Sequence, residues 1–381
     1  MLAGLVGTEA DREETAKHNA IYANQSQNVQ ILNNNVTEWM LGTVKIPDDD
    51  EHSRQPDTYS VLARYYRCLF APNYTVFSNT TSQAQWIQEN GQQPSSNYVV
   101  SLESPHNAIH LSLGGFYQAG VYNADPIRGA NGDMGDNETA GFDPIFYFHH
   151  CFIDYTFATW QRFWGLEKRG SLTVIDNYPG TILQEGQPPN FPVGTKINMT
   201  TPLYPFEKPT GGIYTSEDMT DLSELGIVYG PGSFSPLLDL IDPKKAKSPF
   251  DILYSKLDQR LTAGSSPDTP NPFSLIKWVH GINRVDYEGS FIIRLYAETH
   301  DGKEVEVGRE PVLSRRNVLG CRNCQNHLEV NFHVPIDQKA LQVLQGPNKA
   351  EIKWYAKIQT RDQENSIFIP RDSKAPVIDD L

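Results

Sequence analysis

Two histidines four residues apart are the first feature of this sequence that could do chemistry. His106 and His110 lie in the segment Leu102–Gly115, directly behind Ser104 and Pro105. Residues at positions i and i+4 of a helix share one face, so two imidazoles at this spacing can bind one metal ion. Such pairs also occur on helices that bind no metal, and the pair therefore needs support from elsewhere in the chain.

A second pair, His149 and His150, supplies that support. It lies in the almost entirely apolar segment Asp143–Trp164, which also contains Asp154. Asp154 follows His150 by four residues, so its carboxylate can accept the second N–H of that imidazole, the usual arrangement behind a metal-bound histidine. The alternative is a pair of core histidines whose hydrogen bonds are satisfied within the protein.

Two helices must position these side chains. Ser104 is a suitable N-cap, Pro105 fits the first helical position, and Gly114 and Gly115 mark a plausible end. Asp143 and Pro144 open the second helix in the same way. Because this helix is apolar on all sides, we expect it to be buried.

The rest of the chain divides into a helical part and a β part. Residues 1–262 combine helical periodicity at 15–40 and 56–70 with Pro-, Gly- and Thr-rich segments at 170–250, typical of long loops. After the linker Thr262–Pro272, the segments 289–298, 327–336 and 351–358 alternate apolar and polar residues, as strands do. We predict a mainly α metal-binding core (1–262) followed by a C-terminal antiparallel β domain (263–381).

Composition narrows the partners. The net charge is −14 and no basic run occurs, which argues against nucleic acid and anionic membranes as partners. No apolar stretch approaches the roughly 18 residues that cross a bilayer, and the N-terminus has no secretory signal, so we expect a cytoplasmic protein. Four scattered cysteines do not form a disulfide scaffold, and Cys321 and Cys324 alone are weak evidence for structural zinc.

The two histidine segments together resemble a known family. HNAIH followed by FDPIFYFHHCFID is similar to the second copper-binding half of the fungal tyrosinases and of type-3 copper proteins generally, including hemocyanins. TPLYPFEKPTGGIYTSEDMTDLSELGIVY resembles the end of the tyrosinase core. KWVHGINRVDYEGSFIIRLY and GCRNCQNHLEVNFHV resemble the C-terminal β domain of the same enzymes. The resemblance implies a hemocyanin/tyrosinase-like helical bundle with an added β domain.

The resemblance also implies roles for individual residues. It makes His106, His110 and His150 the three metal ligands, His149 a non-ligand histidine and Phe146 the aromatic residue over the site. Glu103 and Asn107 match the pair that holds a water, so Glu103 is a candidate general acid or base and Asn107 a candidate orienting group. The alternative for Glu103 is compensation of the positive helix N-terminus.

One part of the family pattern is missing. Tyrosinases bind a second copper through three histidines from two earlier helices, whereas only His18 and His52 precede His106 here. Tyr155 also stands where an arginine is common. A single metal cannot share O2 between two copper ions, so we expect no tyrosinase chemistry. Three imidazoles with an open position suit Zn²⁺, which lowers the pKa of a bound water to about 7, although Cu(II) competes for such ligands.

These features resemble the fungal cyclopenases, tyrosinase-like zinc proteins that lack the first metal site. The resemblance implies one Zn²⁺ per chain and a redox-neutral ring contraction of an aromatic alkaloid, a cyclopenin-type epoxide, to a viridicatin-type quinolinone. The substrate rests on this resemblance alone. Two alternatives stay open: a type-3 copper oxidase half completed by another chain, and a non-catalytic binding protein on the same fold.

Overall fold

The computed structural model describes residues 60–90, 98–114, 132–183, 191–227, 229, 273–287, 289–319, 324, 328–360 and 375–381, together with 36, 39 and 40. The chain forms two compact units. One comprises Met1–Ala63, Ser104–His150 and Phe273–Leu381, and the other comprises Arg64–Glu103 and Cys151–Pro272. The predicted boundary at 262/263 and the predicted helical segment at 15–35 lie outside the described residues.

Helix α6 (Glu103–Gly114) carries the first histidine pair. The helix predicted from Ser104 and Pro105 is confirmed, but it begins two residues before Pro105, at Glu103, and Ser104 lies inside its first turn. Gly114 ends the helix for a steric reason. A Cβ at this position would lie 2.0 Å from the backbone nitrogen of Gly135, so only glycine lets residues 132–135 pass this closely.

Helix α7 (Pro144–Trp164) carries the second pair. Its predicted start is confirmed, since Asp143 accepts a hydrogen bond from the Ile145 backbone N–H at 3.1 Å. The expected burial on all sides is wrong. Ile145, Phe148 and Phe152, spaced three and four residues apart, are 41%, 73% and 39% exposed. An apolar helix is covered only where a partner is present: on this face Phe152 packs on Tyr65 at 5.0 Å between ring centroids, whereas Phe148 stays largely exposed.

The C-terminal half of α7 packs in the unit that contains helices α4 (Tyr74–Ser78) and α5 (Thr80–Asn90). Trp160 is fully buried, stacks on Phe77 at 4.5 Å between ring centroids, and donates its indole N–H to the Ala71 carbonyl at 2.9 Å. Helix α3 (Val61–Cys68) confirms the helical pattern predicted at 56–70. Two short strands, β1 (Pro202–Glu207) and β2 (Ile213–Thr215), pair in the otherwise loop-rich segment predicted at 170–250.

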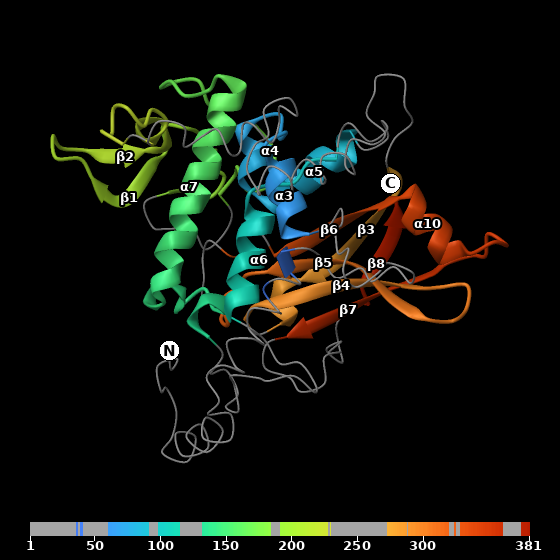
Figure 1. Ribbon diagram of the computed structural model, residues 1–381. Coiled ribbons are helices and arrows are strands. Elements are labelled where there is room, and N and C mark those ends of the chain that lie inside the picture. Colours follow the sequence, from blue (N-terminus) through green and yellow to red (C-terminus); the bar gives the residue numbers. More distant parts are fainter. Residues whose placement is uncertain are drawn as a thin grey trace, which may run out of the picture. The chain divides into compact units, whose positions relative to one another are not determined.

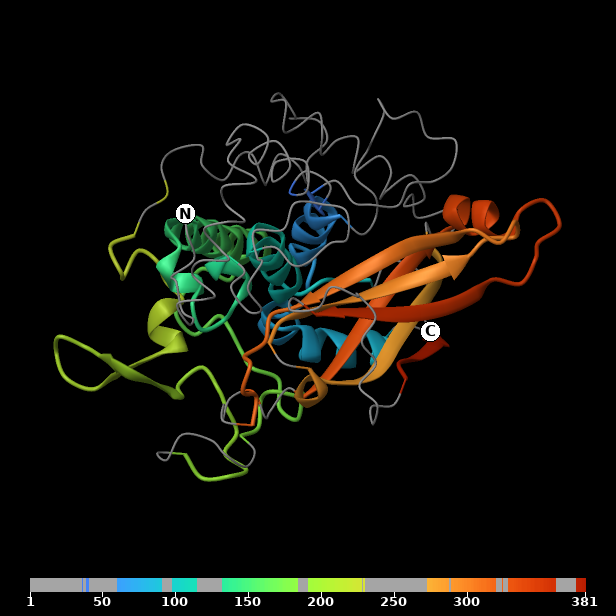
Figure 2. The same cartoon turned by 90° about the horizontal axis from the view of Figure 1, so that it is seen from below.

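The C-terminal region forms two antiparallel three-stranded sheets (Figures 1 and 2). One has the order β6-β3-β8 and the other β5-β4-β7. The strands are β3 (Phe273–Asn283), β4 (Phe291–Glu298), β5 (Glu304–Val312), β6 (Glu329–Asp337), β7 (Lys353–Thr360) and β8 (Val377–Asp380), with helix α10 (Gln338–Gln345) between β6 and β7. Side chains from both sheets share one hydrophobic core, which includes Val279, Ile293, Phe332 and Ile358. The antiparallel β region predicted from alternation is confirmed.

None of the helices in the described part of the chain combines the length and apolar character required to span a bilayer.

Candidate metal centre

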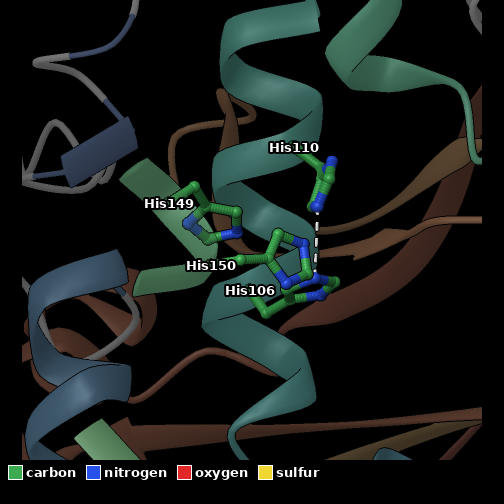
Figure 3. A group of neighbouring side chains, drawn as sticks. All are labelled: His106, His110, His149 and His150. Carbon is green, nitrogen blue, oxygen red and sulfur yellow. Dashed lines mark hydrogen bonds between the residues drawn. The ribbon is translucent and has the colours of Figure 1, made fainter. Parts of the chain in front are cut away.

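Four imidazoles meet between α6 and the start of α7. His106 and His110 come from α6, and His149 and His150 come from α7 (Figure 3). One ligand nitrogen from each residue can be chosen so that all four lie within 4.8 Å of one another. Among the described residues this is the single group of at least three metal-ligating side chains. We call it the histidine cluster.

Hydrogen bonds fix which nitrogen His106 and His110 present to the centre of the cluster. His110 Nδ1 lies 2.7 Å from the Met134 carbonyl oxygen, and His106 Nδ1 lies 2.9 Å from Oδ1 of Asn107. A carbonyl oxygen only accepts, so each Nδ1 carries the proton and each Nε2 presents a lone pair. No local pattern near His110 points to the Met134 carbonyl, because it belongs to a loop 24 residues further along the chain.

The two Nε2 atoms face each other at 3.1 Å (Figure 3). With both Nδ1 atoms protonated, two lone pairs face each other at that distance, an arrangement that a bound cation would stabilise. Burial first, and then the positive charge of protonated His106, lower the pKa of His110 to about 4. Near neutral pH the cation is therefore not an extra proton on this imidazole. A metal ion bound by neutral imidazoles fits this arrangement.

His149 and His150 complete the cluster from α7. The Nε2 atom of each is buried and makes no hydrogen bond. Burial, followed by the positive charge of protonated His106, lowers the pKa of both, to about 2 for His149. Buried polar atoms without partners cost free energy, and a metal ion would satisfy them. The assignment of His150 as a ligand and His149 as a non-ligand stays a prediction, because both lie in the cluster.

Phe146 lies beside the cluster, as predicted. Its ring centroid is 4.1 Å from that of His150 and 5.9 Å from that of His110. The ring therefore covers one face of the His150 imidazole and keeps water from it.

Glu103 makes a structural contact that the sequence did not predict. Its Oε2 accepts hydrogen bonds from the backbone N–H of Thr80 at 2.8 Å and from the Thr80 hydroxyl at 3.0 Å. Thr80 is the first residue of α5, so the carboxylate caps that helix and offsets its N-terminal partial charge. This contact favours the structural alternative for Glu103, and its role as general acid or base stays a prediction.

Asn107 and Asp154 also have partners in the structure. Asn107 is 4% exposed and holds His106, so the group that it demonstrably orients is an imidazole. Asp154 accepts a hydrogen bond from the Tyr229 hydroxyl at 2.6 Å, and the Tyr229 ring packs against Tyr155 at 5.4 Å. The support that Asp154 was expected to give His150 stays a prediction.

The thiols differ from expectation at one position. Cys324 is disulfide-bonded, whereas Cys68 and Cys151 are free. A disulfide at Cys324 is a pairing that the weak evidence for structural zinc at Cys321 and Cys324 did not predict. Cys68 is buried, and Cys151, next to His150 in the sequence, is exposed.

Comparison with known proteins identifies the class to which this fold and site belong. The family description "Common central domain of tyrosinase" matches residues 7–163. A tyrosinase of Hahella sp. (strain CCB-MM4) is 40% identical over 381 residues, which cover 98% of this chain and 62% of that protein. The tyrosinase of Aspergillus oryzae is 37% identical over 325 residues, which cover 82% of this chain and 55% of that protein.

Solved structures agree with the sequence comparison. The tyrosinase of Burkholderia thailandensis at low pH superposes with a TM-score of 0.66 and 39% identity, over 94% of this chain and 62% of that one. Residues 7–163 are thus similar to the tyrosinase central domain, and the described fold resembles that of a type-3 copper protein. It spans about three fifths of the length of these relatives. The family binds copper, which favours copper over the zinc expected from the sequence.

Proposed function

We propose that this chain supplies one copper-binding half of a phenol-oxidising enzyme of the tyrosinase class. The observation that carries the proposal is the histidine cluster, whose ligand nitrogens lie within 4.8 Å of one another on two helices of a tyrosinase-type fold. Imidazole is a good ligand for copper, and Cu(II) binds nitrogen sites more tightly than the other first-row divalent ions.

The residues of the cluster would hold the metal in the following way. His106, His110 and His150 bind copper through Nε2, with the first two rings held by Asn107 and Met134. Phe146 shields the His150 ring and offers an apolar surface for an aromatic substrate. When bound, copper supplies the electron transfer to O2 that oxidation of a phenol requires.

In this proposal a second set of imidazoles comes from another segment of a longer protein or from another chain. Only His18 and His52 precede His106 in the sequence. The surface on which such a polypeptide would pack comprises Ile145, Tyr147 and Phe148 of α7, which are 41%, 61% and 73% exposed, and Phe142 just before the helix, which is 81% exposed. Exposed apolar patches of this kind mark interaction sites. Phe148 directly precedes His149, so a helix covering it would lie next to the cluster.

The greater length of the similar tyrosinases supports a choice of occupant. The Hahella and Burkholderia tyrosinases match nearly the whole of this chain but are longer by more than a third of their own length. We therefore propose that the occupant of this surface is a helical segment with an apolar face and three imidazoles, either elsewhere in a longer protein or in a separate chain.

A second candidate follows from the number of ligands rather than from the relatives. With one histidine cluster and one metal, the chain suits a redox-neutral reaction at a mononuclear zinc, such as the cyclopenase-type ring contraction of an aromatic alkaloid. The neutral state of the imidazoles is equally compatible with this reaction.

Metal analysis separates the two candidates. The purified chain is loaded with copper and with zinc, and metal per chain is measured for the parent, for His150→Ala, and for a control, His300→Ala, which removes an exposed histidine outside the cluster. We expect one copper per chain, lost in His150→Ala only, with the EPR signal of an isolated Cu(II). Loss of that signal on addition of the complementing polypeptide would support a coupled pair. A chain that retains zinc and binds no copper after loading with both metals would refute the oxidase proposal.

A further inference from the structure

Two side chains of the C-terminal β region reach the elements that hold the metal ligands. The first is Glu310 on β5. Its carboxylate accepts the hydroxyl hydrogen of Ser104, with Oγ at 2.9 Å from Oε1 and 3.2 Å from Oε2. Ser104 lies in the first turn of α6, two residues before His106. Ser104 is 3% exposed and Glu310 is 6% exposed, so this contact is screened little by solvent.

The second is Arg316, which follows β5. Its Nε lies 3.5 Å from Oδ2 of Asp136. Asp136 closes the 3-10 turn Asp133–Gly135, in which the Met134 carbonyl accepts the Nδ1 proton of His110. The same turn passes the end of α6 at Gly114 without room for a side chain. Arg316 therefore holds the loop that orients one imidazole, while Glu310 holds the helix that carries two.

A buried carboxylate requires a reason. Burying a charge costs free energy unless hydrogen bonds and opposite charges compensate it. Glu306, on the same strand, is compensated within the β region by Arg294 at 2.7 Å and Arg309 at 2.6 Å. Glu310 directs its carboxylate to the first turn of α6, where the helix dipole and the Ser104 hydroxyl favour a negative charge.

We propose that Glu310 is a positioning residue of the metal centre, and that the β region is a structural part of that centre. Glu310 acts through Ser104 on His106 and His110, and Arg316 acts through Asp136 and the Met134 carbonyl on His110. This inference rests on the proposed function only in the choice of copper as the probe.

Copper affinity of the whole chain tests the proposal. Copper is titrated against a chelator of known affinity for the parent, Glu310→Ala and Glu310→Gln. Groups that orient metal ligands typically change affinity by about 10- to 100-fold when removed. We expect a loss of about that size for Glu310→Ala, and a smaller loss for Glu310→Gln, which keeps an oxygen acceptor for Ser104.

Glu306→Gln is the matched control. It neutralises another carboxylate on β5, one that is paired with Arg294 and Arg309, so it should lower the stability of the β region. Copper affinity should stay within about twofold of the parent, because these ion pairs lie within the β region. Equal losses of copper affinity in Glu306→Gln and Glu310→Ala would mean general destabilisation and overturn the proposal. Parent-like affinity in a folded Glu310→Ala chain would also overturn it.

A readout without metal keeps this proposal separate from the proposed function. If the parent chain binds no copper, the oxidase proposal fails. The positioning role is then measured by NMR on the His110 Nδ1 proton, which the Met134 carbonyl accepts. Arg316→Ala and Glu310→Ala should each speed its exchange with solvent, and exchange at the parent rate in both variants would overturn the inference.

Discussion

Replacing Asn107 tests how the cluster selects the nitrogen that faces the metal. Asn107 is buried, and its side-chain oxygen accepts the Nδ1 proton of His106 at 2.9 Å. In Asn107→Ala this acceptor is lost, so the proton can move to Nε2 or the ring can turn, and either change withdraws the lone pair that metal binding needs. Part of the binding free energy must then be spent on ordering the ring.

The size of the effect follows from the contact. A buried donor left without its acceptor costs about 1–3 kcal/mol, and removal of a group that orients a metal-bound imidazole lowers metal affinity by about 10- to 100-fold, or about 1.4–2.7 kcal/mol. We therefore expect Asn107→Ala to bind copper about 10- to 100-fold more weakly. Asn107→Asp keeps an oxygen acceptor and adds a negative charge, so its affinity should equal or exceed that of the parent.

The assay is a chelator-competition titration with copper at constant pH, with circular dichroism as the check on folding. Two results would refute the reasoning. One is a folded Asn107→Ala chain that binds copper within about twofold of the parent. The other is an Asn107→Asp chain that loses as much affinity as the alanine variant, which would mean that the amide, not an oxygen acceptor, is required.

Three further predictions concern the face of α7, the helical core and the β region. Phe148→Ser should reduce self-association of the isolated chain in sedimentation velocity while changing the free energy of unfolding by less than about 0.5 kcal/mol, and Phe206→Ser, at a position 65% exposed elsewhere, should leave association unchanged. Trp160→Ala should cost about 3–5 kcal/mol in urea unfolding, because the indole is fully buried and stacked on Phe77. Burial, followed by the positive charge of protonated His280, lowers the pKa of His333 to about 3, below the unfolded value of about 6.5. The free energy of unfolding is therefore insensitive to His333 above pH 6.5, and below that pH it falls by at most about 1.4 kcal/mol per pH unit. Urea unfolding between pH 7 and 4.5 should show a weaker pH dependence for His333→Gln than for the parent.

Local signals in the sequence predicted the elements of the site well. Pro105 and Pro144 mark the first turns of α6 and α7, and the alternation at 291–298 marks β4. Helix starts and strand alternation are set by neighbouring residues, so they can be recognised without the rest of the fold. The spacing of His106 and His110 likewise places both on one face of α6.

The partners of the polar side chains could not be predicted in the same way. Glu103 meets Thr80, 23 residues away, Asp154 meets Tyr229, 75 residues away, and Ser104 meets Glu310, 206 residues away. Each contact depends on how distant segments pack, and no periodicity records it. The expectation that α7 is buried on all sides was also wrong. An apolar composition indicates that a helix needs a covering partner, but it does not indicate where that partner lies.

The energetics of the cluster bear on whether the chain is a binding protein without metal chemistry. The Nε2 atoms of His149 and His150 are buried without hydrogen-bond partners, and those of His106 and His110 face each other at 3.1 Å. Each unsatisfied buried group costs about 1–3 kcal/mol, so an apolar replacement at these positions would stabilise a metal-free scaffold. A bound metal reverses the sign of that cost for the nitrogens that bind it, because it satisfies their lone pairs. The cluster is therefore favourable to folding only in a chain that binds metal. The parent should gain stability with copper, and His150→Ala should be at least as stable as the parent in the metal-free state.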